Sequence, residues 1–235
     1  DQPLGIYWGA ETDGVYSSWE EANSSGIAGA APGEIRYINH HVDLDDSGQP
    51  LEIQEINFDD YVKIGDPNPD FTYSISNNFT YKNWDASILF TGQRGGDLFW
   101  VDSWQLSGLQ KTTNILSTSY ANSWIAPLYY ENGNYIYDES VGNLNSVNHP
   151  GAMIETGSRA ISSDRNIFDG SFVRLKNINI GYNFDLKNGK NMRVYLAGQN
   201  LVVWTDYPGY DPEVRTYTKN PQKRGVDFGT YPGTR

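Results

Sequence analysis

The chain contains no cysteine and only three histidines. Without cysteine it can form no disulfide, no thiolate zinc site and no thiol nucleophile. His40 and His41 are adjacent, and neighbouring side chains of an extended segment point to opposite sides, which argues against a shared metal ion. A catalytic triad needs a histidine beside a serine and a carboxylate, and no spacing in the sequence indicates one. We therefore predict no catalytic residues and expect that the chain is not an enzyme.

Basic residues are also scarce, with 17 Lys and Arg against 29 Asp and Glu and a formal net charge of −12. A nucleic-acid partner is not expected, because binding it requires cations that neutralise phosphates. Carboxylate pairs such as Glu20-Glu21 and Asp59-Asp60 resemble the acid pairs of glycoside hydrolases. In so acidic a chain such pairs arise by chance, and we assign them no role.

Long apolar runs are missing, since no stretch approaches the roughly 20 residues of a transmembrane helix. Helical periodicity is equally hard to find. A strand of a transmembrane β-barrel needs only about 10 alternating residues, so this absence excludes helical spans alone.

The chain is rich in aromatic residues, at 14%, and in period-two alternation. Residues 71–81 place apolar side chains on one face and Thr, Ser and Asn on the other, and residues 84–93 alternate in the same way. Only Lys82 and Asn83 separate the two runs, which predicts a tight antiparallel hairpin. Asn77 interrupts the apolar face and predicts a bulge or a weak point.

A second hairpin is predicted over residues 172–184 and 192–204, joined by residues 185–191. The first strand alternates regularly from Ile178 onward, but Val173 and Leu175 have the opposite parity. Either the register shifts near Lys176, or Arg174 and Lys176 project at the level of lipid headgroups. The sequence leaves both alternatives open.

Aromatic residues gather toward the ends of these strands, as in the interfacial girdles of membrane barrels. Alternation alone fits equally a half-buried sheet of a soluble protein. The candidate girdle residues are Phe71, Tyr73, Phe79, Tyr81, Trp84, Phe90, Tyr182, Phe184 and Trp204.

The segments outside the hairpins are long and polar. The predicted divisions are 1–69 (a first strand and a loop), 70–93 (a hairpin), 94–170 (a long loop), 171–204 (a hairpin) and 205–235 (a loop). Short turns on one side and long loops on the other are typical of outer-membrane barrels, whereas compact soluble domains rarely contain such long loops.

The long loops carry the candidates for ligand binding. Aromatic side chains stack on sugar faces or hold peptide side chains. The alternative is that they pack the loops together or against a partner lipoprotein. The candidates are Trp100, Trp104, Trp124, Tyr129 and Tyr130.

A weak calcium motif lies in the first loop. Asp43, Asp45 and Ser47, followed by Gly48, resemble the opening of a calcium-binding loop. The twelfth position is Gln54, which cannot supply the bidentate carboxylate, so a solvated acidic loop is the default reading. No other cofactor is expected.

Several blocks, taken in order, resemble the C-terminal part of SusC-like TonB-dependent transporters of Bacteroidetes. Among them are SFVRLKNINIGY at 171–182, RVYLAGQNL at 193–201, GYDPE at 209–213 and GVDFGTYP at 225–232. Further blocks lie at 3–16, 31–37 and 64–71, so the resemblance reaches from one end of the chain to the other.

The resemblance implies an all-β chain, an antiparallel transmembrane β-barrel segment with long extracellular loops in the bacterial outer membrane. The remainder of the same polypeptide would complete the barrel, with a final strand after residue 235 and with TonB contacted through an N-terminal region. A SusD-like surface lipoprotein would be the partner, and oligosaccharides or peptides the substrates. The alternative is a soluble secreted β-sandwich that binds or hydrolyses glycans.

Overall fold

The computed structural model describes residues 3–103, 106, 114–138, 142, 150–151, 161–187, 189–214 and 223–229. The chain divides into two compact units. Unit 1 comprises Asp1–Gly5, Asp66–Leu98 and Phe168–Arg235, and unit 2 comprises Ile6–Gly65 and Phe99–Ile167. In the described part of the chain, no helix is long and apolar enough to cross a membrane.

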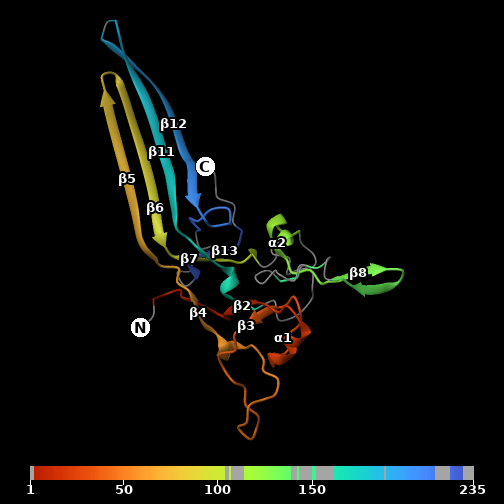
Figure 1. The fold of residues 1–235 in the computed structure, drawn as a ribbon. Coiled ribbons are helices and arrows are strands. Elements are labelled where there is room, and N and C mark those ends of the chain that lie inside the picture. The colour runs from red at the N-terminus through yellow and green to blue at the C-terminus, as the bar shows by residue number, and fades with distance from the viewer. Residues whose placement is uncertain are drawn as a thin grey trace. The chain divides into compact units, whose positions relative to one another are not determined.

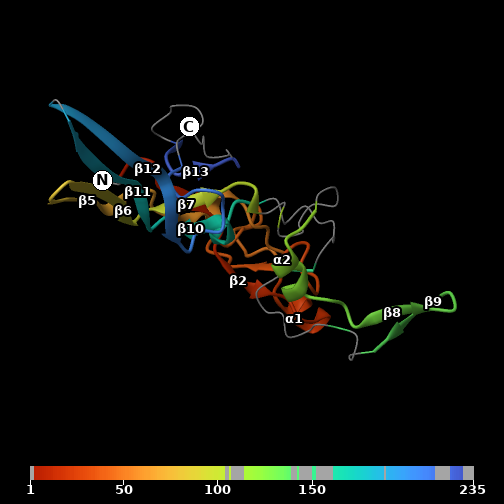
Figure 2. The same cartoon turned by 90° about the horizontal axis from the view of Figure 1, so that it is seen from above.

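Unit 1 is built on a four-stranded antiparallel sheet with the strand order β12-β11-β6-β5. Its strands lie side by side in both views (Figures 1 and 2). They are β5 (Pro69–Tyr81), β6 (Trp84–Gly95), β11 (Phe172–Leu186) and β12 (Lys190–Thr205). Both hairpins therefore lie where the alternation predicts them, and the second turn is tighter than predicted.

The first turn consists of Lys82 and Asn83, and Lys82 has a φ of 52°. The register runs without interruption from Phe71–Arg94 to Tyr81–Trp84, passing through Asn77 opposite Ile88. The predicted bulge at Asn77 is therefore wrong. The irregularity in β5 lies instead between Pro69 and Phe71, where the strand begins.

A small three-stranded sheet has the order β10-β7-β13, formed by β10 (Ile167–Asp169), β7 (Asp97–Trp100) and β13 (Val226–Asp227). Within unit 1, Gly170 N–H donates to the carbonyl of Gly96 at 3.0 Å.

Unit 2 shows that the segments predicted as loops carry structure of their own. Two-stranded antiparallel pairings join β1 (Tyr7–Gly9) to β4 (Val62–Gly65), and β2 (Thr12–Val15) to β3 (Ile35–Tyr37). A third joins β8 (Leu128–Glu131) to β9 (Asn134–Tyr137) and is seen clearly in Figure 2. The helical turns are α1 (Trp19–Ser24), η1 (Phe58–Asp60), α2 (Ser117–Asn122) and η5 (Asp164–Asn166).

Unit 2 contains a small apolar core. Ala10, Ile35 and Tyr37 are buried, and Ile56, Tyr61 and Ile161 pack against them. Strands of three or four residues with irregular connections between them have no long alternating pattern, which is why periodicity does not reveal this unit.

Candidate functional surfaces

The long sheet of unit 1 has one apolar face, and the cross-strand register shows which residues share it. Directly paired residues of neighbouring strands point to the same face, and every second residue along a strand joins them. By register, Asn77 and Arg94 also lie on this face. Its apolar side chains are those of Phe71, Tyr73, Ile75, Phe79 and Tyr81 of β5, Trp84, Ala86, Ile88 and Phe90 of β6, Val173, Leu175, Ile178, Ile180, Tyr182 and Phe184 of β11, and Met192, Val194, Leu196, Val202 and Trp204 of β12.

Much of this apolar face is open. The relative exposure of Phe79 is 58%, that of Trp84 is 52% and that of Leu196 is 78%. Soluble proteins rarely expose apolar patches of this extent. The surface is therefore one that needs an apolar environment.

The nine candidate girdle residues all lie on this face, in two groups. At the turn end, the Trp84 and Tyr182 rings lie 4.8 Å apart and the Tyr182 and Phe184 rings 4.6 Å apart. At the other end, Phe71 and Tyr73 lie 6.0 Å apart, and the register brings Trp204 into the same cross-strand row as Tyr73.

The spacing of the two groups suits a membrane. The ten residue steps from Phe71 to Tyr81, at ~3.4 Å each and with a strand tilt of ~40°, span roughly 25 Å, the height of the apolar band of an outer-membrane barrel. The girdle role itself remains a prediction.

The opposite face, which we call the polar face, carries hydroxyl, amide and charged side chains. Arg193 Nη2 lies 2.5 Å from Asp85 Oδ2, and Asn183 Nδ2 donates to Asp85 Oδ1 at 3.1 Å. Thr72, Ser74, Ser76, Asn78 and Thr80 of β5 lie on the same face by register. Such a surface is suited to water and to polar solutes.

The structure decides between the two alternatives for Arg174 and Lys176. The register of β11 against both neighbours shifts between Leu175 and Asn177, and against β6 this shift leaves Lys176 as an extra residue. This bulge returns Val173 and Leu175 to the apolar face and moves Arg174 to the polar face. The register-shift alternative is therefore correct.

Arg174 is the functional candidate that the sequence analysis missed. It is buried, with 6% exposure, and its Nη2 lies 2.5 Å from Asp211 Oδ1. The sequence held two signals for it. Arg174 is a cation at a position where the alternation of the strand predicts an apolar side chain, and the later block GYDPE carries two carboxylates.

The predicted ligand-binding aromatics lie in different places. Trp100 and Trp124 are buried, at 6% and 7% exposure. Tyr129 and Tyr130 lie in β8, but their side chains fall outside the described part, as does Trp104 altogether. Nothing described brings these five side chains together around one cavity, and their ligand-binding role stays a prediction.

In the calcium motif, the carboxylates accept hydrogen bonds from backbone N–H groups of the same loop. Asp45 Oδ1 accepts from the backbone N–H groups of Ser47 and Gln49 at 2.8 and 2.9 Å, and Asp43 Oδ2 accepts from Glu55 N–H at 3.2 Å. Gln54 Nε2 donates to the Leu51 carbonyl at 2.7 Å. Among the described residues, no group of three or more His, Asp or Glu side chains is placed to hold a metal ion. Calcium binding stays an untested prediction.

The first two histidines make structural contacts. The backbone N–H groups of His40 and His41 both donate to Asp60 Oδ1 at 2.9 Å, and His40 Nε2 lies 3.0 Å from Glu11 Oε2. Asp60 is fully buried, so these donors satisfy a carboxylate that would otherwise be costly to bury. His149 lies outside the described residues.

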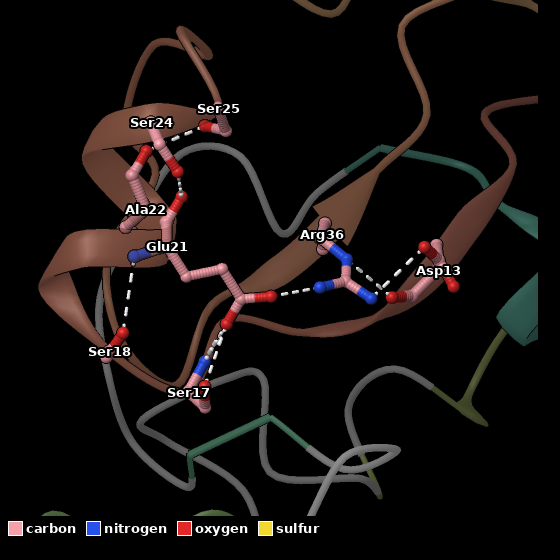
Figure 3. A network of polar contacts seen from close by, with 8 residues as sticks. All are labelled: Asp13, Ser17, Ser18, Glu21, Ala22, Ser24, Ser25 and Arg36. Atoms are coloured by element: carbon pink, nitrogen blue, oxygen red, sulfur yellow. Dashed lines mark hydrogen bonds and ion pairs between the residues drawn. The ribbon is translucent and has the colours of Figure 1, made fainter.

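A polar network fixes α1 against the paired strands β2 and β3 of unit 2 (Figure 3). Ser17 donates its backbone N–H and its hydroxyl to Glu21 Oε2, each at 2.8 Å, and Arg36 contacts Glu21 Oε1. Arg36 Nε also donates to the Asp13 carbonyl at 2.7 Å. The Ser17 N–H is the main cause that lowers the pKa of Glu21, aided by the Ser17 hydroxyl and by Arg36, while burial acts in the opposite direction.

Comparison with known proteins supplies the context for these surfaces. No family model matches the chain. TonB-dependent receptor P3 of Formosa agariphila is 33% identical over 246 residues, an alignment that covers 100% of this chain and 21% of the receptor. TonB-dependent receptor SusC of Bacteroides thetaiotaomicron is 31% identical over 120 residues, covering 42% of this chain and 11% of SusC.

A structure of the RagAB peptide transporter matches 97% of this chain and 21% of its own chain, with a TM-score of 0.61 and 17% identity. The resemblance to SusC-like TonB-dependent transporters is confirmed. The first curated relatives are much longer proteins, and the chain spans about a fifth of their length, 21% in each case. All of these relatives are named as receptors or a transporter and none as an enzyme, in agreement with the expectation for this chain.

Proposed function

We propose that this chain forms part of the wall of an outer-membrane, TonB-dependent importer of oligosaccharides or peptides. The observation that carries the proposal is the long sheet, which is apolar and exposed on one face and polar on the other. A transmembrane strand needs this arrangement, because one face meets hydrocarbon and the other meets the aqueous interior. The named relatives support the same class of function.

A soluble β-sandwich, the alternative, fits this surface poorly. In a sandwich the apolar faces of two sheets pack against each other and are buried. Here Phe71, Phe79 and Leu196 are exposed by 56%, 58% and 78%. Burying this face against lipid rather than against a second sheet accounts for both its extent and its aromatic ends.

The proposed partners follow from the relatives. A SusD-like lipoprotein would cover the extracellular side, and TonB would act through a part of the polypeptide outside this segment. The structural neighbour is named as a peptide transporter and SusC-type sequences are also matched, so peptides and oligosaccharides both stand as substrates in the proposal.

The proposal is tested with the full-length protein in its native outer membrane. Deleting the gene should abolish uptake of a fluorescent oligosaccharide mixture or of a fluorescent peptide mixture, while leaving uptake of small diffusing solutes unchanged. Purification in detergent, followed by mass spectrometry, should recover a surface lipoprotein and a bound oligosaccharide or peptide. Unchanged uptake of both mixtures, or recovery of the protein from the soluble fraction, would contradict the proposal.

A further inference from the structure

The bulge at Lys176 changes which face of the sheet receives a charged side chain. From Ile178 to Phe184, the even-numbered residues of β11 lie on the apolar face. Without an extra residue, Arg174 would continue this series and point to the same side. The register shift between Leu175 and Asn177 instead places Arg174 opposite Thr91 of β6, on the polar face.

Arg174 is buried there against two carboxylates. Its side chain is 7% exposed, its Nη2 lies 2.5 Å from Asp211 Oδ1, and its Nε lies 2.9 Å from Glu213 Oε2. The Nε–H direction does not meet hydrogen-bond geometry, so the Glu213 contact is an ion pair only. Lys176 Nζ, from the bulge itself, lies 3.2 Å from the same Glu213 oxygen. A buried guanidinium is tolerated only when it is paired in this way.

Both carboxylates come from the segment that follows β12. Glu213 N–H donates to Asp211 Oδ1 at 2.9 Å, and this turn aims the two acids at the same guanidinium. The segment has a second attachment, because the Tyr207 hydroxyl lies 2.5 Å from Asp227 Oδ2. Residues 206–214 are therefore tied at two points within unit 1.

We propose that the Lys176 bulge and Arg174 form a clamp that holds residues 206–214 against the polar face of β11. The clamp joins two distant blocks of the sequence, RLK at 174–176 and DPE at 211–213, into one unit. If the polar face lines the importer's interior, which rests on the proposed function, the clamped segment is a fixed part of that interior rather than a free loop.

The test measures how easily the segment opens in the purified full-length protein. Chymotrypsin can cut after Tyr210, a residue that is 65% exposed, but cleavage requires the surrounding segment to leave its site. Arg174→Met should raise the rate of this cut about tenfold or more, because proteolysis follows the population of the open form. Mass spectrometry of the fragments assigns the cut to this bond.

Arg193→Met is the matched control, since Arg193 also pairs with a carboxylate on the polar face, and within the described part of the chain its side chain contacts Asp85, Asn179 and the Tyr195 ring rather than residues 206–214. Its cut rate should equal that of the unmodified protein. If Arg174→Met does not assemble, Asp211→Asn tests the clamp in its place. This variant leaves β11 unchanged and should also accelerate the cut. The combined Arg174→Met and Asp211→Asn variant should be cut no faster than the faster single variant.

The clamp would be overturned if Arg174→Met were cut at the same rate as Arg193→Met. Where Arg174→Met does not assemble, the same comparison is made with Asp211→Asn. Additive effects of the two substitutions would also overturn the clamp, because they would mean that the side chains do not act together. The readout requires no transport, so failure of the clamp is separable from failure of the import proposal.

Discussion

At the scale of single residues, burial separates side chains that hold the fold from those free to meet a ligand. Trp124 is 7% exposed, and a Cβ placed on Gly33 would lie 2.5 Å from its Cε3 atom. Gly33 has a φ of +84°, so both its conformation and the indole ring that lies over it require glycine. Packing is the role that these contacts support for Trp124, although the sequence also suggested ligand contact.

Replacing Trp124 distinguishes the two roles. Trp124→Ala should destabilise unit 2 by about 3–5 kcal/mol, because a large buried side chain leaves a cavity. Trp19→Ala is the control, since Trp19 is 63% exposed and should change stability by at most ~0.5 kcal/mol. Limited proteolysis of the full-length protein measures both. Unchanged stability of Trp124→Ala together with a loss of ligand binding would favour the ligand role.

The Glu21 network predicts a pH dependence of unit 2. A carboxyl group whose folded pKa lies below its ordinary value of 4.5 stabilises the fold fully above that pH, and this contribution is lost as the pH falls through the lowered pKa. Glu21→Gln should therefore cost roughly 1 kcal/mol at neutral pH. The difference from the unmodified protein should shrink in acid.

Hydrogen exchange of residues 17–24, compared between variant and unmodified protein at each pH, measures this effect. Glu20→Gln is the control, because Glu20 lies in the same helical turn and its side chain makes no hydrogen bond or ion pair within the described part of the chain. A difference between Glu21→Gln and the unmodified protein that persists undiminished below the lowered pKa would refute the role of ionised Glu21.

At the scale of elements, the hairpins are the part that the sequence predicts best. Their strands of 12 to 16 residues alternate over a long distance, and alternation is a local property of the sequence. In the sequence, the bulge at Lys176 shows only as a break in the alternation of apolar and polar residues. Which residue becomes the extra one depends on pairing with distant strands, which the local sequence does not contain. Asp211 lies 37 residues from Arg174 and Glu213 lies further still, so no local pattern could reveal the contact. The same holds for unit 2, whose short strands pair with distant segments.

The two faces of β6 predict opposite responses to one substitution. Ile88 pairs with Ile178 on the apolar face, whereas Ser87 pairs with Asn179 on the polar face. Ile88→Arg should cost about 2–4 kcal/mol if this position lies in the middle of the bilayer, and Ser87→Arg far less. Denaturant unfolding of the full-length protein in lipid vesicles measures both. Equal costs would remove the case for a lipid-facing surface.

At the scale of the whole molecule, the proposal assigns a side of the membrane to each connection. Short turns of outer-membrane barrels lie in the periplasm and long loops outside the cell. The turn at Lys82 and Asn83 and the turn near Gly189 should therefore be periplasmic, and residues 94–170 extracellular.

Protease added to intact cells tests this orientation. It should cut within 94–170 and leave both turns intact, while cells with a permeabilised outer membrane expose the turns as the control. Cleavage at either turn in intact cells would reverse the assignment. Mass spectrometry of the membrane-bound fragments locates each cut.

The central claim is that the apolar face of the long sheet contacts lipid, and spin labelling tests it most directly. The segment contributes no cysteine of its own, so single cysteines can be placed at Ile180 and Leu196 on the apolar face, and at their neighbours Asn179 and Ala197 on the polar face. In the full-length protein in vesicles, labels at Ile180 and Leu196 should be reached by oxygen in preference to a water-soluble nickel complex. Labels at Asn179 and Ala197 should show the reverse. Nickel access that is equal on both faces, or higher at Ile180 and Leu196, would contradict the account.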